Sequence, residues 1–201
     1  MIKTALWLML FFGVLLWSAI HPKDYFTWFL EVFPALIGLG LMAWSYKRFP
    51  LTSLLYILIL LHSIVLMVGG HYTYAEVPLF DTIRDLLDLE RNNYDKVGHF
   101  MQGFAPAILA REILLRKKVV LSTGWLNYIV LSIILAFSAF YELIEWAVAE
   151  MSGEGAEAFL GTQGYVWDTQ SDMAWALFGG VMALLLLSKY HHTLLQKDNY
   201  V

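Results

Sequence analysis

The sequence predicts an all-α, polytopic membrane protein with six transmembrane helices, on the evidence of its composition and its long apolar segments. Of its 201 residues, 59% are hydrophobic and 15% are charged, and the mean hydropathy is +0.61. A soluble domain is about 45–50% apolar and about 25% charged. Because a globule of this size still exposes roughly a third of its unfolded surface, the excess requires a lipid bilayer as solvent. Composition therefore excludes disorder, nucleic-acid binding and a water-soluble enzyme as leading classes.

Six segments are long enough to cross the hydrocarbon layer, which takes about 20 mostly apolar residues. Four of them qualify readily, whereas the fourth and the sixth carry polar residues on one side. Pro22 and Pro50 predict tight turns after the first two spans, because proline lacks an amide donor. Glycines predict a loop over 151–166. We expect a single integral membrane domain, 1–201, with spans at about 4–20, 25–46, 51–71, 94–115, 124–149 and 168–190.

The distribution of lysine and arginine predicts the orientation, since these residues are enriched in short cytoplasmic loops. One set of span ends holds Lys23, Arg84, Arg91 and Lys96. The other set holds more than twice as many, namely Lys3, Lys47, Arg48, Arg111, Arg116, Lys117, Lys118, Lys189 and Lys197. Both termini are therefore expected to be cytoplasmic.

The outer loop between the third and fourth spans is expected to contain a short amphipathic helix. Its apolar residues fall at helical spacing, opposite charged ones: Leu79, Ile83, Leu86 and Leu87 face away from Arg84, Asp85 and Asp88. Two interpretations fit this pattern equally well: a helix lying in the headgroup plane, or an amphipathic lid over the bundle.

Each of the last three spans carries a pair of ionisable groups near its outer end. A charged side chain that faces lipid costs about 2.5–3.5 kcal/mol on insertion scales, so such groups normally face protein or water. The members of each pair are three or four residues apart and share a helix face. The three pairs lie at similar distances from the outer ends of their spans, so we expect them to converge in a periplasm-facing pocket. The pairs are Asp95 with His99, Glu142 with Glu145, and Asp168 with Asp172.

Three further polar residues are assigned to this pocket. Gln102 continues the stripe that Asp95 and His99 form on the fourth span. Lys96 and Gln163 are the candidates for orienting a substrate. The first three spans carry few ionisable groups, and we expect them to act as scaffold.

One imidazole among several carboxylates suits a divalent metal ion. Oxygen-rich ligation favours magnesium, calcium or manganese, and the histidine leaves zinc open. A metal would polarise an ester or phosphoryl oxygen or activate a bound water. Without a metal, adjacent carboxylates suit proton transfer or a general acid and base pair. The candidate metal ligands are His99, Glu142, Glu145 and Asp172.

A structural interpretation remains open for each pair taken singly. Groups near the interface are often solvated, and Lys96 or Arg91 can pair with Asp95, Asp168 or Glu145. Three pairs at one depth, with a histidine among them, favour a functional polar site over three unrelated ion pairs.

Three motifs stand out in the second half of the chain: YDKVGHF at 94–100, YELIEW at 141–146 and LGTQGYVWDTQSDM at 160–173. With them the chain resembles the YjdF-type bacterial inner-membrane proteins over nearly its whole length. The resemblance implies a multi-pass protein of the bacterial inner membrane and assigns no activity.

A looser resemblance, to the VanZ-like proteins associated with glycopeptide-antibiotic resistance, covers spans four to six. Glu145 and Ala176 depart from that pattern, in which glutamine and asparagine are usual. This resemblance implies a shared three-helix polar site without implying a shared substrate. Its matching positions are Asp95, Lys96, His99, Phe100, Glu142, Asp172 and Gly179.

The expected function is to bind, or to modify chemically, a cell-envelope or lipid-linked molecule at the outer pocket. The alternative of a small ion- or proton-coupled transporter requires the polar stripe to continue inward. Beyond Pro106, however, the fourth span offers only Ile108, Leu109 and Ala110 before Arg111. A further alternative is a non-enzymatic membrane assembly or stress-response partner.

Overall fold

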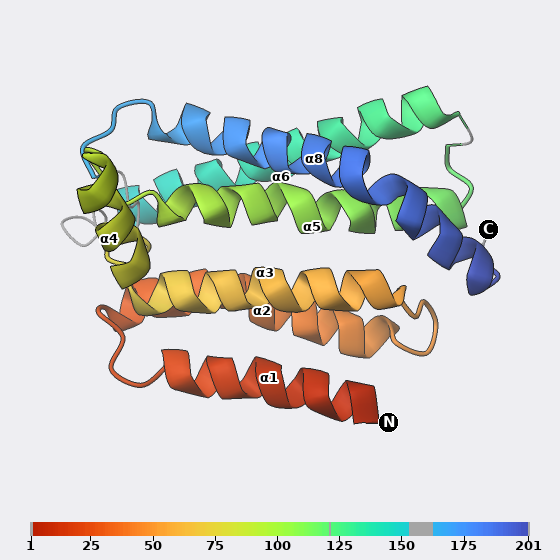
Figure 1. The fold of residues 1–201 in the computed structure, drawn as a ribbon, viewed down its shortest axis with the longest axis horizontal. Coiled ribbons are helices and arrows are strands. Elements are labelled where there is room, and N and C mark those ends of the chain that lie inside the picture. Colours follow the sequence, from red (N-terminus) through yellow and green to blue (C-terminus); the bar gives the residue numbers. More distant parts are fainter. Residues whose placement is uncertain (1, 121, 153–162, 201) are drawn as a thin grey trace.

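The computed structural model describes residues 2–120, 122–152 and 163–200, and these residues form helices and turns without a strand. Six helices run along the long axis of the molecule, and α4 lies across one end of them (Figure 1). A helix stands at each expected span, which confirms the all-α prediction. The helices are α1 (Ile2–Ser18), α2 (Tyr25–Ser45), α3 (Ser53–His71), α4 (Pro78–Leu87), α5 (Tyr94–Arg116), α6 (Thr123–Ser152) and α8 (Asp168–Lys197).

The helices end close to the predicted breaks. No helix covers Pro22 or Pro50, and the Asp24 carboxylate begins α2 by accepting a hydrogen bond from the Thr27 amide at 2.6 Å. At the other break, α6 continues to Ser152, so it overruns the start of the expected loop 151–166. Residues 153–162 of that loop lie outside the described part of the chain.

Four helices are long and apolar enough to cross a membrane by length and composition, namely α2, α3, Thr123–Met151 of α6, and α8. The apolar segment of α1, Thr4–Ser18, is shorter. Helix α5 is not apolar enough by the same measure because it carries many polar residues, yet most of these are buried in the bundle. A helix that its neighbours shield from lipid can carry polar groups at membrane depth.

The six long helices form two layers, α1–α3 and α5, α6 and α8 (Figure 1). The most extensive contact joins α5 and α8, and it depends on two glycines. A β-carbon on Gly103 would lie 1.7 Å from the Ala176 carbonyl oxygen, and one on Gly179 would lie 2.1 Å from the Phe100 carbonyl oxygen. The two backbones touch at these points. This contact brings together the ends of α5 and α8 that lie opposite the two termini (Figure 1).

Helix α4 lies at the end of the bundle opposite both termini (Figure 1), and we call this end the outer end after the orientation that the sequence predicts. None of its residues is buried, and Leu79, Leu86 and Leu87 are 66%, 77% and 65% exposed. A lid would bury its apolar face, so these exposures favour the headgroup-plane interpretation. The helix is attached through Phe80, whose ring packs edge-on against Tyr94 at 5.2 Å between centroids.

An ion pair fastens two outer loops to each other. Lys23, after α1, lies 2.8 Å from a carboxylate oxygen of Glu76, before α4. Its hydrogen bond to Glu76 raises the pKa of the Lys23 ammonium group above its usual value. Both side chains are about half exposed, so the pair contributes little to the free energy of unfolding.

Candidate functional site

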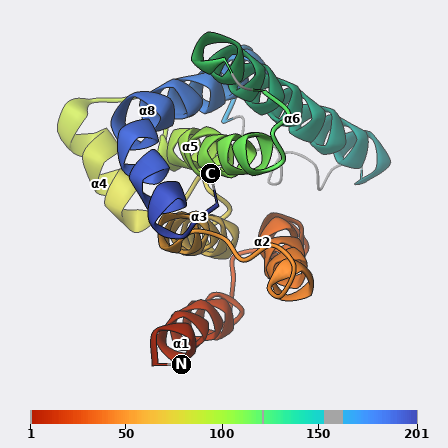
Figure 2. The same cartoon turned by 90° about the vertical axis from the view of Figure 1, so that its right-hand side faces the viewer.

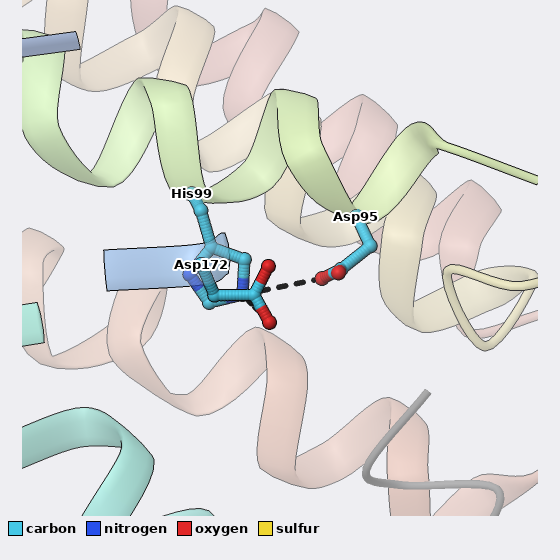
Figure 3. A group of neighbouring side chains, drawn as sticks. All are labelled: Asp95, His99 and Asp172. Carbon is cyan, nitrogen blue, oxygen red and sulfur yellow. Dashed lines mark ion pairs between the residues drawn. The ribbon is translucent and has the colours of Figure 1, made fainter. Parts of the chain in front are cut away.

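Helices α5 and α8 bring Asp95, His99 and Asp172 together near the outer end of the bundle (Figure 3). The Nε2 atom of His99 lies 3.2 Å from Oδ1 of Asp95 and 3.8 Å from Oδ2 of Asp172. All three side chains are buried, and one ligand atom from each lies within 4.8 Å of the others. We call these three residues the acid–histidine cluster.

Two cationic side chains, those of Lys96 and Arg91, form ion pairs with the aspartates of the cluster. Lys96 Nζ lies 3.3 Å from Oδ2 of Asp95 and 3.0 Å from Oδ1 of Asp168, and it donates to Oδ1 of Asp172. Arg91 also pairs with Asp168 and with Oδ2 of Asp95. Asp95 and Asp172 thus each give one oxygen to the cations and turn the other toward His99.

These ion pairs explain how the charged side chains of Lys96 and Asp168 can be buried. Both are buried in contacts with other charged residues, as the structural interpretation anticipated. Lys96 therefore orients the two aspartates of the cluster, and its contacts give no support to a direct role in orienting a substrate.

Gln102, one turn below His99 on α5, fixes the direction of the imidazole. Its Oε1 atom lies 3.2 Å from Nδ1 of His99. When Nδ1 carries the proton it donates to Gln102, and the lone pair of Nε2 then faces the two aspartate oxygens. Three electron-rich atoms in such proximity require a proton or a cation between them. In metal-binding histidines the ring nitrogen that does not bind the metal typically donates a hydrogen bond to an acceptor such as this one.

Helix α6 contributes Glu142 and Glu145. The Oε1 atom of Glu142 lies 3.8 Å from Nδ1 of His99. It is buried and has no hydrogen-bond partner among the residues that the structure describes. Such an atom costs free energy unless a ligand or a proton satisfies it. Glu145, three residues later, lines a cavity that adjoins the cluster.

Gln163 was predicted to belong to the site, but its hydrogen bonds are formed with the backbone of Asn92 and not with the acid–histidine cluster. It is exposed. Its Oε1 accepts from the Asn92 amide at 3.0 Å, and its Nε2 donates to the Asn92 carbonyl at 2.9 Å. The side chain therefore fastens the segment before α8 to the start of α5, and its predicted role in orienting a substrate gains no support.

A cavity of about 600 Å³ opens beside the cluster, between α2 and α3 on one side and α5 and α6 on the other. Asp95, His99 and Gln102 line its outer part together with Glu31 of α2. Glu31 thus adds a carboxylate from the first three spans, which were expected to act as scaffold, to the cavity wall. A lone glutamate in the otherwise apolar segment 25–46 was the signal that could have identified Glu31, because an isolated intramembrane carboxylate marks a functional site by default.

The opposite end of the bundle contains a second buried polar group, centred on Glu112. Its carboxylate accepts hydrogen bonds from Thr52 Oγ1 at 2.8 Å and Arg116 at 2.7 Å, and lies 2.9 Å from Nε2 of His191. The other His191 nitrogen lies 2.8 Å from Arg111. Because Glu112 is fully partnered within the protein, this group joins the ends of α5 and α8 to the start of α3 as a structural tie.

Comparisons with known proteins identify the family. The family described as "Predicted membrane protein (DUF2238)" matches residues 3–193. The "Inner membrane protein YjdF" of Escherichia coli (strain K12) is 49% identical over 178 residues, which cover 89% of this chain and 85% of that protein. No solved structure matches, and the VanZ-like resemblance stays a prediction. The resemblance to YjdF-type proteins is confirmed, and the chain belongs to the DUF2238 family of membrane proteins.

Proposed function

We propose that this inner-membrane protein binds, and acts chemically upon, a cell-envelope or lipid-linked molecule at a divalent cation held by the acid–histidine cluster. The observation that carries the proposal is the convergence of Asp95 Oδ1 and Asp172 Oδ2 on Nε2 of His99. In a tetrahedral site with bonds of 2.0–2.2 Å, ligand atoms lie ~3.4 Å apart. The separations of 3.2 and 3.8 Å suit such an ion after small side-chain movements.

The proposed ligand set differs from the one that the sequence suggested. Asp95 joins His99 and Asp172, because its oxygen faces the same ring nitrogen. Glu142 faces the other ring nitrogen, and Glu145 lines the adjoining cavity. These two glutamates are therefore placed to contact the bound molecule or to accept a proton from it.

A bound divalent ion would polarise an ester or phosphoryl oxygen of the bound molecule. The protein would supply the rest of the chemistry. Lys96 holds the two aspartates in position, Gln102 holds the imidazole, and the Oε1 atom of Glu142 is available as a proton acceptor. Burial of all these groups excludes bulk water and strengthens their electrostatic effect.

The proposed topology has six spans, one integral membrane domain and both termini in the cytoplasm. Both termini lie at the same end of the bundle (Figure 1), as an even number of crossings requires. Lysine and arginine are concentrated at that end, which supports its cytoplasmic location. The acid–histidine cluster then faces the periplasm.

The test is metal content and metal-dependent stability of the purified full-length protein in detergent. We expect Mn²⁺ or Zn²⁺ to copurify at about one ion per chain and to raise the unfolding temperature. His99→Ala and Asp172→Asn should abolish both effects. Asp85→Asn, which changes an exposed carboxylate on α4, should preserve them. Absence of a stabilising ion among Mn²⁺, Zn²⁺, Mg²⁺ and Ca²⁺ in the unaltered protein would overturn the proposal.

A further inference from the structure

The cavity beside the acid–histidine cluster continues inward as a long groove. Glu31 and Ser45 of α2 both line it, and α2 advances about 21 Å between them at 1.5 Å per residue. At its inner end the groove reaches Arg48 and Lys117. It therefore follows most of the ~30 Å hydrocarbon thickness of a bilayer.

The groove is open sideways, between α2 and α6. Leu41 of α2 and Phe137 of α6 line it and are 57% and 49% exposed. Figure 2, which looks along the bundle from the end holding both termini, shows α2 and α6 standing apart on the same flank of α3 and α5. A molecule already dissolved in the membrane can enter between these two helices without crossing water.

Between His62 and the basic inner end, most of the residues that line the groove are apolar. Met42 of α2 lines this part together with Ala105, Pro106 and Leu109 of α5, and Ile113 follows toward the inner end. Such walls give a hydrated ion few polar partners. This argues against a conduction path, as the apolar residues after Pro106 predicted. They suit a hydrocarbon chain, and a cavity of about 600 Å³ is within the usual size range of ligand sites.

The outer end of the groove is acidic and aromatic. Carboxylates of Glu31, Asp95 and Glu145 line it together with the rings of Tyr74 and Tyr141. Around the acid–histidine cluster and this end of the groove, six carboxylates lie near two cationic side chains: Glu31, Asp95, Glu142, Glu145, Asp168 and Asp172 against Arg91 and Lys96. A cationic group complements the negative charge of these carboxylates, and it also binds well against the faces of aromatic rings.

A second unpartnered polar atom lies between the two parts of the groove. Nε2 of His62, on α3, is buried without a hydrogen-bond partner among the described residues, and His62 lines the groove. His62 lies nine residues from the outer end of α3 at His71, which is about 14 Å of helix. An oxygen that links a polar head to a hydrocarbon chain would satisfy this nitrogen.

We propose that the groove holds a lipid with a protonated amine at its head. The hydrocarbon chain lies between α2 and α6, and the ammonium group lies between Glu31 and Glu145. The assignment rests on the proposed function, because it names the class of molecule that the outer site acts on.

The test compares two amphiphiles that differ only at the head, hexadecylamine and hexadecanol, added to the full-length protein in a nonionic detergent. The unfolding temperature is measured against the concentration of each. We expect the unfolding temperature to rise to saturation with the amine. The same rise should need about ten times the concentration of the alcohol. Equal responses to the two would overturn the assignment of the head.

Two glycines of α2 provide a matched pair of variants for the chain. Gly38 lines the groove, whereas Gly40 is exposed outside it. A β-carbon on either would have no atom within 4 Å, so a side chain can start from both positions without a clash at its first atom. Gly38→Phe should abolish the response to both amphiphiles, and Gly40→Phe should retain it. A full response in Gly38→Phe would show that the chain lies elsewhere.

A charge variant and a metal measurement complete the experiment. Glu31→Gln with Glu145→Gln should weaken the response to the amine about tenfold and leave the response to the alcohol unchanged. An unchanged response to the amine would overturn the proposal. Metal binding should be intact in Gly38→Phe, because Gly38 is not part of the acid–histidine cluster. A failure of the lipid assignment alone is thereby distinguished from a failure of the metal site.

Discussion

Two buried glutamates of this protein differ in what their surroundings supply. Glu112 has Thr52, Arg116 and His191 as partners, whereas Oε1 of Glu142 has no hydrogen-bond partner in the part of the chain described. Burial of a carboxylate oxygen without a hydrogen-bond partner lowers the free energy of unfolding. Glu142 is therefore a residue that costs stability and that a ligand would satisfy, while Glu112 contributes stability.

The same substitution should consequently have opposite effects at the two positions. Glu142→Gln removes the charge of a buried carboxylate whose Oε1 atom has no hydrogen-bond partner within the described chain, and it should raise the free energy of unfolding by about 1–3 kcal/mol. Glu112→Gln breaks a partnered buried network and should lower it by about 3–5 kcal/mol. Thermal or urea unfolding in detergent measures both. A shift in the same direction for the two variants would contradict this account of the site.

At the scale of the helix, the site depends on how closely α5 approaches α8. Gly103 and Gly179 allow backbone contact between the two helices, and small residues serve this purpose widely in membrane bundles. Because Asp95 and His99 lie on α5 and Asp172 lies on α8, the separation of these helices sets the separation of the ligand atoms.

A single methyl group at this contact should affect both stability and binding. Gly103→Ala or Gly179→Ala should lower the free energy of unfolding by about 1–3 kcal/mol, since one backbone must move away. It should also weaken metal-dependent stabilisation, because His99 and Asp172 separate. Gly13→Ala on α1, where a β-carbon has no atom within 4 Å, is the control. Stability equal to that control would show that the α5–α8 contact is looser than the structure indicates.

At the scale of the whole molecule, the two ends of the bundle are chemically different. One end carries α4, the acid–histidine cluster and most of the carboxylates, and the other carries both termini. Topology therefore determines which side of the membrane supplies the molecule that the site binds.

Cysteine labelling tests this orientation directly, because the natural chain contains no cysteine. Asp85→Cys on α4 should react with a membrane-impermeant maleimide added to intact spheroplasts. Lys197→Cys at the end of α8 should react only after the membrane is permeabilised. Both positions are exposed. The reverse pattern would place the acid–histidine cluster on the cytoplasmic side and exclude a periplasmic ligand.

Much of the fold could be predicted from local pattern alone. The helices begin and end near prolines such as Pro22 and Pro50. The amphipathic pattern around Leu79 and Leu86 predicted α4, and the structure chose between its two interpretations through the exposure of those leucines. Spacing within a helix also predicted that Asp95 and His99 share one face, where the structure has them 3.2 Å apart.

The amino-acid sequence by itself determined the membrane environment, the helices and which polar residues share a helix face, because apolar length and helical periodicity are local properties. Only the tertiary structure decided which faces meet. It added Glu31 from a distant helix to the cavity and paired Lys96 with three aspartates. It also showed that the Gln163 side chain forms hydrogen bonds with the backbone of Asn92. Contacts of this kind depend on how helices far apart in sequence pack, and no local pattern encodes that packing.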